Sequence, residues 1–186
     1  MKNAFRLGKR LYLRPLQSDD LELCRSWLND PAIHSFLARH RPLSEAEERE
    51  WFEGLSKRES DTVLGIALRE GERLIGSCGL HHASLPNRNA ELGIVIGEAK
   101  FHGQGYGKEA IDLLLAYGFD TLNLHRISLY VYAYNSRAIR CYEKSGFRRE
   151  GTRREARWSE GRWWDILEYA ILEQEWRTAN PREAAK

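Results

Sequence analysis

The chain has 186 residues, of which 42% are hydrophobic and 30% are charged, a composition typical of one globular domain. Its 29 Lys and Arg residues nearly balance 27 Asp and Glu residues, which argues against nucleic-acid binding as the main function. No apolar run approaches the roughly 18 residues that a membrane span requires, and the polar, basic residues 1–10 do not predict a signal peptide. We therefore expect a cytoplasmic protein that binds neither membranes nor nucleic acid.

Three cysteines, Cys24, Cys78 and Cys141, are odd in number and far apart in the sequence. They form neither a CxxC motif nor a paired framework, as expected for a reducing compartment. No repeat, linker or low-complexity tract divides the chain. The sequence predicts a single domain over residues 1–186, with a core at about 10–176 and a polar, frayed tail at 177–186.

The first third of the chain predicts one strand followed by helices. Arg10–Leu16 has the pattern of a strand, and Ser18 is a suitable N-cap for a helix directly after it. A short second helix is expected at 32–37. Ser44 and Glu47 form a capping box, which predicts the start of a third helix.

From Thr62 onward the pattern changes to strands separated by two helices. One helix follows a glycine-rich loop near residue 105, and a shorter one is expected to begin at a Ser136 cap and to end at Gly146. The predicted strands of this part are 62–68, 73–80, 90–96, 127–132, 148–158 and 162–172.

The glycine-rich loop is His102-Gly103-Gln104-Gly105-Tyr106-Gly107-Lys108, between a predicted strand and a predicted helix. Alternate glycines allow a tight turn whose N–H groups face an anion at a helix N-terminus, although a plain strand-to-helix turn is the simpler alternative. A Walker loop requires Ser or Thr where Glu109 stands, and a Rossmann fingerprint requires glycine where Lys108 stands. We infer a phosphate-binding loop of another type.

A second motif lies downstream at Asn135-Ser136-Arg137-Ala138-Ile139-Arg140-Cys141-Tyr142-Glu143-Lys144-Ser145-Gly146-Phe147. On a helix, Ala138 and Tyr142 are four residues apart and share one face. Together with the glycine loop, this motif resembles the Gcn5-related N-acetyltransferase (GNAT) superfamily. The resemblance extends from about Arg10 to Trp176.

The opening of the chain narrows the resemblance. Leu13-Arg14-Pro15-Leu16 and Trp27-Leu28-Asn29-Asp30-Pro31 resemble the branch that contains ribosomal-protein alanine and serine N-acetyltransferases and spermidine acetyltransferases. One departure stands in the loop, where His102 replaces the Arg or Gln usual in the family. A histidine can still donate to a phosphate, through a weaker contact.

The resemblance implies an α/β (α+β) fold with a mixed, mostly antiparallel sheet of about seven strands flanked by helices. It implies that strand 92–96 splays from strand 127–132 and that acetyl-CoA binds in the gap. The backbone of Ile94, Val95 and Ile96 is then expected to pair with the pantetheine arm. The glycine loop is expected to hold the pyrophosphate and Asn135 to hydrogen-bond the cofactor chain.

The other cofactor contacts implied are cationic. Arg140, with Arg137 and Lys144, is placed to meet the 3′-phosphate of coenzyme A. These residues are equally well explained as solvated surface cations.

Acetyl transfer to an amine requires a proton acceptor, an oxyanion donor and a proton donor for the departing thiolate. Tyr142 is the candidate acid, against the alternative of a tyrosine that only packs. Glu91 is the candidate base, acting through water, although a water chain alone is an alternative. Cys78 and Cys141 lack an evident His partner, so we expect inert thiols rather than acetylated intermediates. The adjacent His81 and His82 do not have the spacing of metal ligands on a helix, so we expect no metal site.

The amine acceptor is left open by the sequence. His34, Phe36, Trp158, Trp163 and Trp164 are candidates for an aromatic acceptor groove, or else for core packing or a homodimer contact. The acceptors considered are a peptide N-terminus, a polyamine, an aminoglycoside or amino sugar, or another small amine. A non-catalytic acyl-CoA-binding regulatory module is the remaining alternative.

Overall fold

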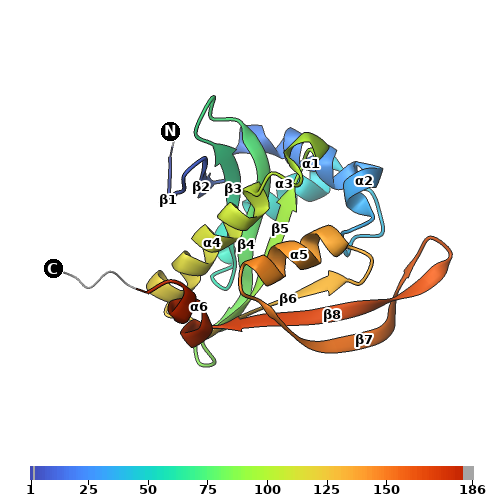
Figure 1. Ribbon diagram of the computed structural model, residues 1–186. Coiled ribbons are helices and arrows are strands. Elements are labelled where there is room, and N and C mark those ends of the chain that lie inside the picture. The colour runs from blue at the N-terminus through green and yellow to red at the C-terminus, as the bar shows by residue number, and fades with distance from the viewer. Residues whose placement is uncertain (2, 182–186) are drawn as a thin grey trace.

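The computed structural model describes residue 1 and residues 3–181, and its centre is one mixed sheet. The strands are β1 (Arg6–Leu7), β2 (Leu11–Pro15), β3 (Thr62–Leu68), β4 (Leu74–Ser84), β5 (Asn89–Ile96), β6 (Arg126–Tyr132), β7 (Arg148–Ser159) and β8 (Arg162–Leu172). Their order in the described sheet is β1-β2-β3-β4-β5-β6-β8-β7, and only the β5–β6 pair is parallel (Figure 1). The predicted mostly antiparallel sheet is confirmed, with eight strands rather than about seven, because the two-residue β1 is too short to leave a pattern.

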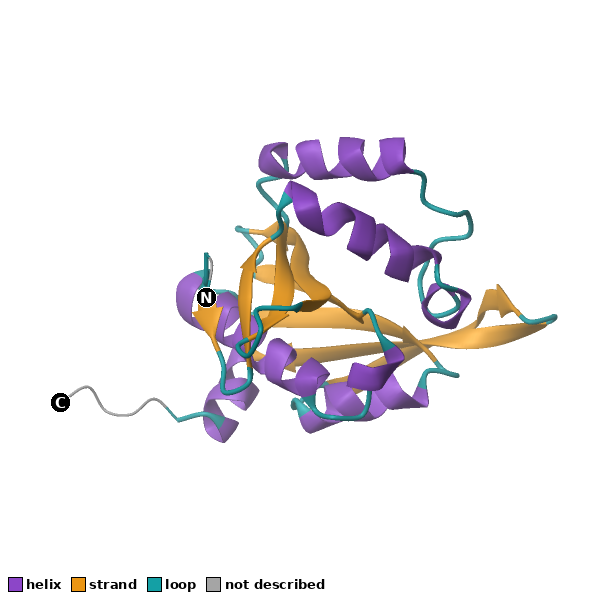
Figure 2. Ribbon diagram, turned by 90° about the horizontal axis from the view of Figure 1, so that it is seen from above, coloured by secondary structure: helices purple, strands orange, loops and turns teal. Residues whose placement is uncertain are grey.

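Helices cover both faces of the sheet. They are α1 (Leu21–Asn29), α2 (Pro31–His34), α3 (Glu45–Glu53), α4 (Tyr106–Ala116), α5 (Ser136–Lys144) and α6 (Glu173–Ala179). Seen from above, α1 to α3 lie on one side of the sheet, and α4 and α5 lie on the other (Figure 2). Helix α4 is the best buried of these, since Ala110, Ile111, Leu114 and Leu115 recur at the helical period and are at most 1% exposed.

The sheet opens between β5 and β6. Strand β5 pairs with β4 as far as Ile96, whereas its pairing with β6 ends at Glu91, opposite Ser128. The other edge of β6 pairs with β8 along the whole length of β6. The predicted splay of strand 92–96 from strand 127–132 is therefore confirmed.

Three local predictions were wrong. Ser18 does not cap the first helix: it begins a 3-10 turn (Ser18–Asp20) whose N-cap is Gln17, and the N-cap of α1 is Asp20. The N-cap of α5 is Asn135 rather than Ser136, because the Asn135 side-chain oxygen accepts the Ala138 N–H at 3.2 Å. The second helix, α2, ends at His34 instead of Leu37.

The first residues of the predicted frayed tail are helical instead. Helix α6 includes residues 177–179, and its Glu175 carboxylate accepts the Leu172 N–H at 3.0 Å. Trp176 is 9% exposed and packs on Phe119, with 5.4 Å between ring centroids. This apolar anchor holds the helix against the sheet, and the end of the predicted tail, residues 182–186, lies outside the described residues.

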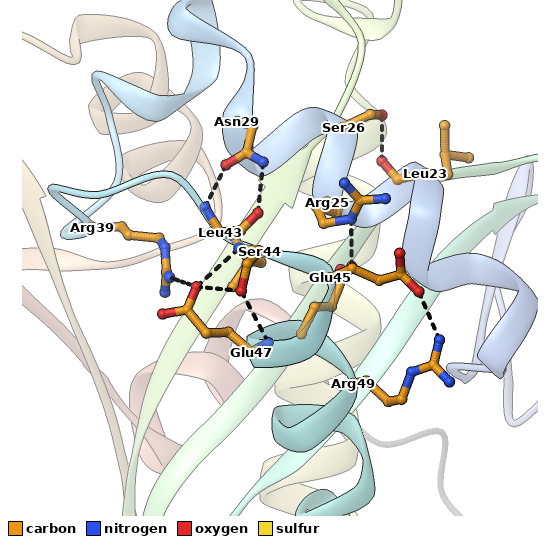
Figure 3. Close-up of polar contacts among 11 residues, drawn as sticks. Leu23, Arg25, Ser26, Asn29, Arg39, Leu43, Ser44, Glu45, Glu47 and Arg49 are labelled. Atoms are coloured by element: carbon orange, nitrogen blue, oxygen red, sulfur yellow. Dashed lines mark hydrogen bonds and ion pairs between the residues drawn. The ribbon is translucent and has the colours of Figure 1, made fainter.

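Polar contacts fix the segment between α2 and α3 (Figure 3). The Asn29 side chain accepts the Leu43 N–H at 2.7 Å and donates to the Leu43 carbonyl at 2.9 Å. The predicted capping box is present, since Ser44 and Glu47 each accept the other's backbone N–H. These contacts hold residues 35–43 beside the open part of the sheet.

Candidate active site

A continuous cavity of about 830 Å³ lies where β5 and β6 part. Residues from both helical layers line it, so the cavity reaches both faces of the sheet. On the α4–α5 side the lining includes His102, Gly103, Gly105, Gly107, Lys108, Asn135, Arg137, Arg140 and Lys144. On the α2 side and along β6 to β8 it includes Ile33, Phe36, Leu37, Ala38, Tyr130, Tyr132, Arg153 and Ile166.

The glycine loop is held in a shape that only glycine adopts easily. Gly103 and Gly105 have φ angles of +72° and +85°, in the left-handed region, and Gly105 is the N-cap of α4. Arg10 braces the loop from outside by donating to the Gln104 carbonyl at 2.9 Å and lying 4.4 Å from the centre of the Tyr106 ring. The loop and the N-terminus of α4 therefore line the cavity, a geometry that can bind an anion.

The side chains of Gln104 and Tyr106 are not part of the cavity lining. Gln104 donates to the Lys100 carbonyl, and Tyr106 packs edge-on against Phe101 at 5.9 Å. Lys108 does line the cavity, and its ammonium group pairs with Asp112 at 2.6 Å. The side chains of Gln104 and Tyr106 therefore contact the residues just before the loop and not the cavity.

His102 connects three elements of the site. Its Nδ1 accepts from the Arg137 guanidinium at 2.7 Å, which leaves Nε2–H to donate to the Ile96 carbonyl at 2.9 Å. Both ring nitrogens are engaged, so in this arrangement the histidine has no free donor, whereas Arg137 also lines the cavity and has further N–H groups. The family's usual Arg or Gln is thus replaced by a residue that positions an arginine from α5.

The candidate acid, Tyr142, lies in the cavity wall. Its side chain is 8% exposed and packs edge-on against Phe147 at 6.0 Å. Burial raises the pKa of the Tyr142 phenol above its ordinary value, and the neighbouring Cys141 adds to this effect. The phenol is therefore protonated at neutral pH, as a proton donor has to be.

The candidate base, Glu91, lies at the point where the two strands part. It is the last β5 residue paired with β6, and its partner on the neighbouring strand β4 is His81. Among the described residues, Glu91 is the only carboxylate in the cavity lining. Ile94, Val95 and Ile96 follow it along the unpaired edge of β5 and also line the cavity.

Three cations of α5 line the cavity. Arg137 is held by His102 and lies 5.8 Å from the centre of the Phe36 ring. The side chains of Arg140 and Lys144 have no hydrogen bond or ion pair to another described residue. Both charges remain free to meet an anion.

Most residues predicted for the acceptor groove lie elsewhere. Of the five, only Phe36 lines the cavity. Trp158 and Trp163 are 54% and 56% exposed near the tip of the long β7–β8 hairpin, where they contact each other at 5.2 Å (Figure 1). Trp164 packs edge-on against Tyr134 at 5.0 Å.

Sequence reasoning missed several residues that line the α2 side of the cavity. Tyr130 and Tyr132 alternate on β6, and that period of two was the available signal for one strand face. Leu37 and Arg153 carried no such signal, because they reach the cavity from a loop and from a different strand.

The three cysteines are free thiols in the structure. Burial raises the pKa of Cys78 to about 12 and also raises the pKa of Cys141. In the described part of the chain, no group of three or more His, Cys, Asp or Glu side chains is placed to hold a metal ion. None of the helices described is both long enough and apolar enough to span a bilayer.

Comparisons with known proteins agree with this geometry. Residues 10–148 match the family described as an acetyltransferase (GNAT) domain. Spermidine N(1)-acetyltransferase of Vibrio cholerae is 28% identical over 170 residues, covering 91% of this chain and 97% of the relative. Uncharacterized N-acetyltransferase p20 of Bacillus licheniformis is 29% identical over 172 residues, covering 90% and 96%.

Solved structures show the same architecture. The spermidine N-acetyltransferase of Vibrio cholerae in complex with CoA and spermine superposes with a TM-score of 0.84 at 29% identity, covering 90% of this chain and 98% of that one. A GNAT-family acetyltransferase from Bacillus anthracis gives a TM-score of 0.79 at 27% identity, covering 91% and 99%.

A sheet that parts beside a glycine-rich helix N-terminus defines the class of acyl-CoA-dependent transferases. Within that class, the chain belongs to the GNAT acetyltransferase family. It is an acetyl-CoA-dependent N-acetyltransferase that acts on an amine.

Proposed function

We propose that the protein transfers an acetyl group from acetyl-CoA directly to a primary amine while both substrates occupy the cavity. The observation that carries this proposal is the single cavity reached from both faces of the sheet, with Glu91 and Tyr142 in its lining. The raised thiol pKa values of Cys78 and Cys141 favour direct transfer over an acetyl-cysteine intermediate.

The cofactor lies along the unpaired edge of β5 in this proposal. The backbone of Ile94, Val95 and Ile96 pairs with the pantetheine arm, and the loop from His102 to Lys108 holds the pyrophosphate at the N-terminus of α4. Arg140 and Lys144 meet the 3′-phosphate. The Asn135 amide nitrogen donates to the cofactor chain, since its oxygen is used as the α5 cap.

The amine nitrogen attacks the thioester carbonyl, and a backbone N–H of β5 stabilises the oxyanion. Glu91 accepts the amine proton through water. The carbon–sulfur bond breaks as the intermediate collapses, and Tyr142 donates its proton to the departing thiolate. The products are the acetylated amine and coenzyme A.

The acceptor has two candidate classes. A peptide N-terminus or other small amine fits a cavity with an apolar acceptor side, formed by residues such as Ile33, Leu37 and Ile166. A polyamine is favoured by the likeness to the Vibrio cholerae enzyme, whose structure contains spermine. That enzyme is also described as dodecameric, so we propose a homo-oligomer here. We also propose a cytoplasmic location, as expected from the sequence.

The proposal is tested by measuring thiol release from acetyl-CoA with a panel of N-terminal peptides, polyamines, aminoglycosides and amino sugars. Release that depends on one class of amine supports the proposal. Cofactor binding without release for any amine would instead favour the regulatory module. Light scattering of the same preparation reports the oligomeric state.

A further inference from the structure

One buried arginine lies next to the cavity without a carboxylate. Arg157 is 8% exposed, and it forms no ion pair with an Asp or Glu among the described residues. Its guanidinium donates to the Leu37 carbonyl at 3.2 Å and lies 3.3 Å from His40 Nδ1, while its Nε has no partner. A buried charge left uncompensated is costly, so an anionic partner from outside the chain would satisfy it.

The surrounding backbone places Arg157 in this position. The β7–β8 register shifts between Arg153 and Arg157, and Glu155 within this stretch has a φ angle of +50°. A bulge of this kind redirects the side chains that follow it. It brings Arg157 to the segment after α2 instead of leaving it in solvent as its neighbour Arg154 is.

The charge of Arg157 acts on the acceptor side of the cavity. The guanidinium carbon lies 4.7 Å from the centre of the Tyr132 ring, and Tyr132 and Leu37 both line the cavity. Arg157 thus lies directly behind the wall that these two residues form. A charge in a poorly solvated position influences its neighbourhood more strongly than one in water.

The remaining charges on this side do not offset Arg157. Arg153 lines the cavity, but Glu168 neutralises it at 2.6 Å. Glu91 is the only acidic residue in the described lining, and the proposed chemistry uses it at the reacting amine. The second and third ammonium groups of a polyamine would therefore lie near the positive charge behind this wall, where they require carboxylates.

We propose that the acceptor is a monoamine whose non-reacting part is apolar or aromatic and ends in a carboxylate compensated by Arg157. The apolar part lies against Leu37 and Tyr132, and the amine lies toward Glu91. This inference rests on the proposed function, because it names the acceptor class for that same cavity.

A binding measurement tests the proposal without turnover. Calorimetry on the CoA-loaded protein compares 3-phenylpropionate with the isosteric, uncharged 3-phenylpropanamide. The carboxylate is expected to bind at least about tenfold more tightly, because the poorly solvated charge of Arg157 behind the wall attracts it and does not attract the neutral amide. Equal affinities in the wild-type protein would overturn the proposal even if the enzyme acetylates an amine.

Substitutions assign the effect to Arg157. Arg157→Met keeps most of the side-chain length and is expected to abolish the preference, whereas Arg157→Lys is expected to retain part of it. Arg154→Met removes the same charge from an exposed position of β7 and is expected to leave the preference unchanged. A preference that persists in Arg157→Met, or falls equally in Arg154→Met, would refute the assignment, and thermal melting confirms that each variant is folded.

Turnover separates this inference from the proposed function. The dipeptide Phe-Gly is expected to be a better acceptor than Phe-Gly amide, and both better than spermidine, when kcat/KM values are compared. Turnover of spermidine with the higher kcat/KM would support the proposed function while rejecting the anionic acceptor. Anion-selective binding without release of thiol for any amine would instead support the anion site while rejecting the proposed acetyl transfer.

Discussion

The Glu109 carboxylate accepts both the backbone N–H of Arg10 and its side-chain Nε–H, at 2.7 and 2.9 Å. Glu109 is in the first turn of α4, and Arg10 in turn holds the Gln104 carbonyl. Burial opposes ionisation of Glu109, but the hydrogen bonds from Arg10 and Leu11 outweigh it and lower the pKa of the carboxyl. These contacts hold the N-terminal segment against the glycine loop.

Glu109→Gln is expected to lower the free energy of unfolding at pH 7 by about 1–3 kcal/mol, the cost of weakening charge-assisted hydrogen bonds to a partly buried group. Because the folded pKa lies below the unfolded value of about 4.3, this contribution is present above that pH and is lost as the pH falls through the folded pKa. Urea unfolding from pH 7 to pH 3 should show the wild type and the variant converging.

The matched control for this prediction is Glu45→Gln. Glu45 pairs with Arg49 at 2.7 Å, but the two side chains are 69% and 64% exposed. Such a pair contributes about 0.5 kcal/mol or less. A loss in Glu45→Gln as large as that in Glu109→Gln would contradict the role given to burial and loop bracing.

Tyr142→Phe removes the proposed acid and keeps the ring that packs on Phe147. We expect kcat to fall about 100-fold or more, the usual effect of losing a general acid. The affinity for coenzyme A should change little, which calorimetry can check. Unchanged turnover would leave Tyr142 as a packing residue only.

Gly105→Val tests whether the glycine loop binds the pyrophosphate of coenzyme A. The backbone φ of Gly105 is +85°, which a valine adopts only with strain. An added Cβ would also lie 3.3 Å from Arg10 Nη2, so the loop has to change shape. We expect the variant to fold but to lose coenzyme A binding. Gly71→Val is the control, since Gly71 also has a positive φ but lies in the β3–β4 turn with no atom within 4 Å of its added Cβ. Equal loss of binding in both would point to general destabilisation.

The thiols provide an independent prediction. Burial raises the pKa of both Cys24 and Cys78 to about 12, so almost no thiolate is present at pH 8. Both should resist Ellman's reagent in the folded protein and react once it is unfolded. Cys78→Ala should retain kcat within about threefold, consistent with direct transfer; an acetylated cysteine in mass spectra of the turning-over enzyme would contradict this mechanism.

The parts of the site that depend on local sequence could be predicted. The alternating glycines near Gly105 and the helix bearing Tyr142 are short, contiguous motifs, so their geometry follows from neighbouring residues. The parting of β5 and β6 was accessible only through the family resemblance, because pairing between strands 89–96 and 126–132 depends on contacts far apart in the chain.

Other features could not be predicted because they arise from tertiary contacts. His102 becomes a bridge between Ile96 and Arg137 only when α5 packs beside the loop. Arg157 is one of many arginines in a strongly basic stretch, and nothing in its local sequence distinguishes it from the exposed Arg154. Its burial follows from the β7 bulge and from the distant segment after α2.

The open edge of β5 beyond Glu91 has a further consequence for how this protein behaves among other chains. An unpaired strand edge on an outer surface invites a neighbouring chain to add a strand and start aggregation. Here the edge is internal, with β6 beyond the gap and helices on both faces of the sheet. A neighbouring chain therefore cannot extend the sheet at this edge as it could at an exposed one. The unpaired backbone groups of β5 face the cavity instead, where a linear ligand with amide groups of its own can pair with them.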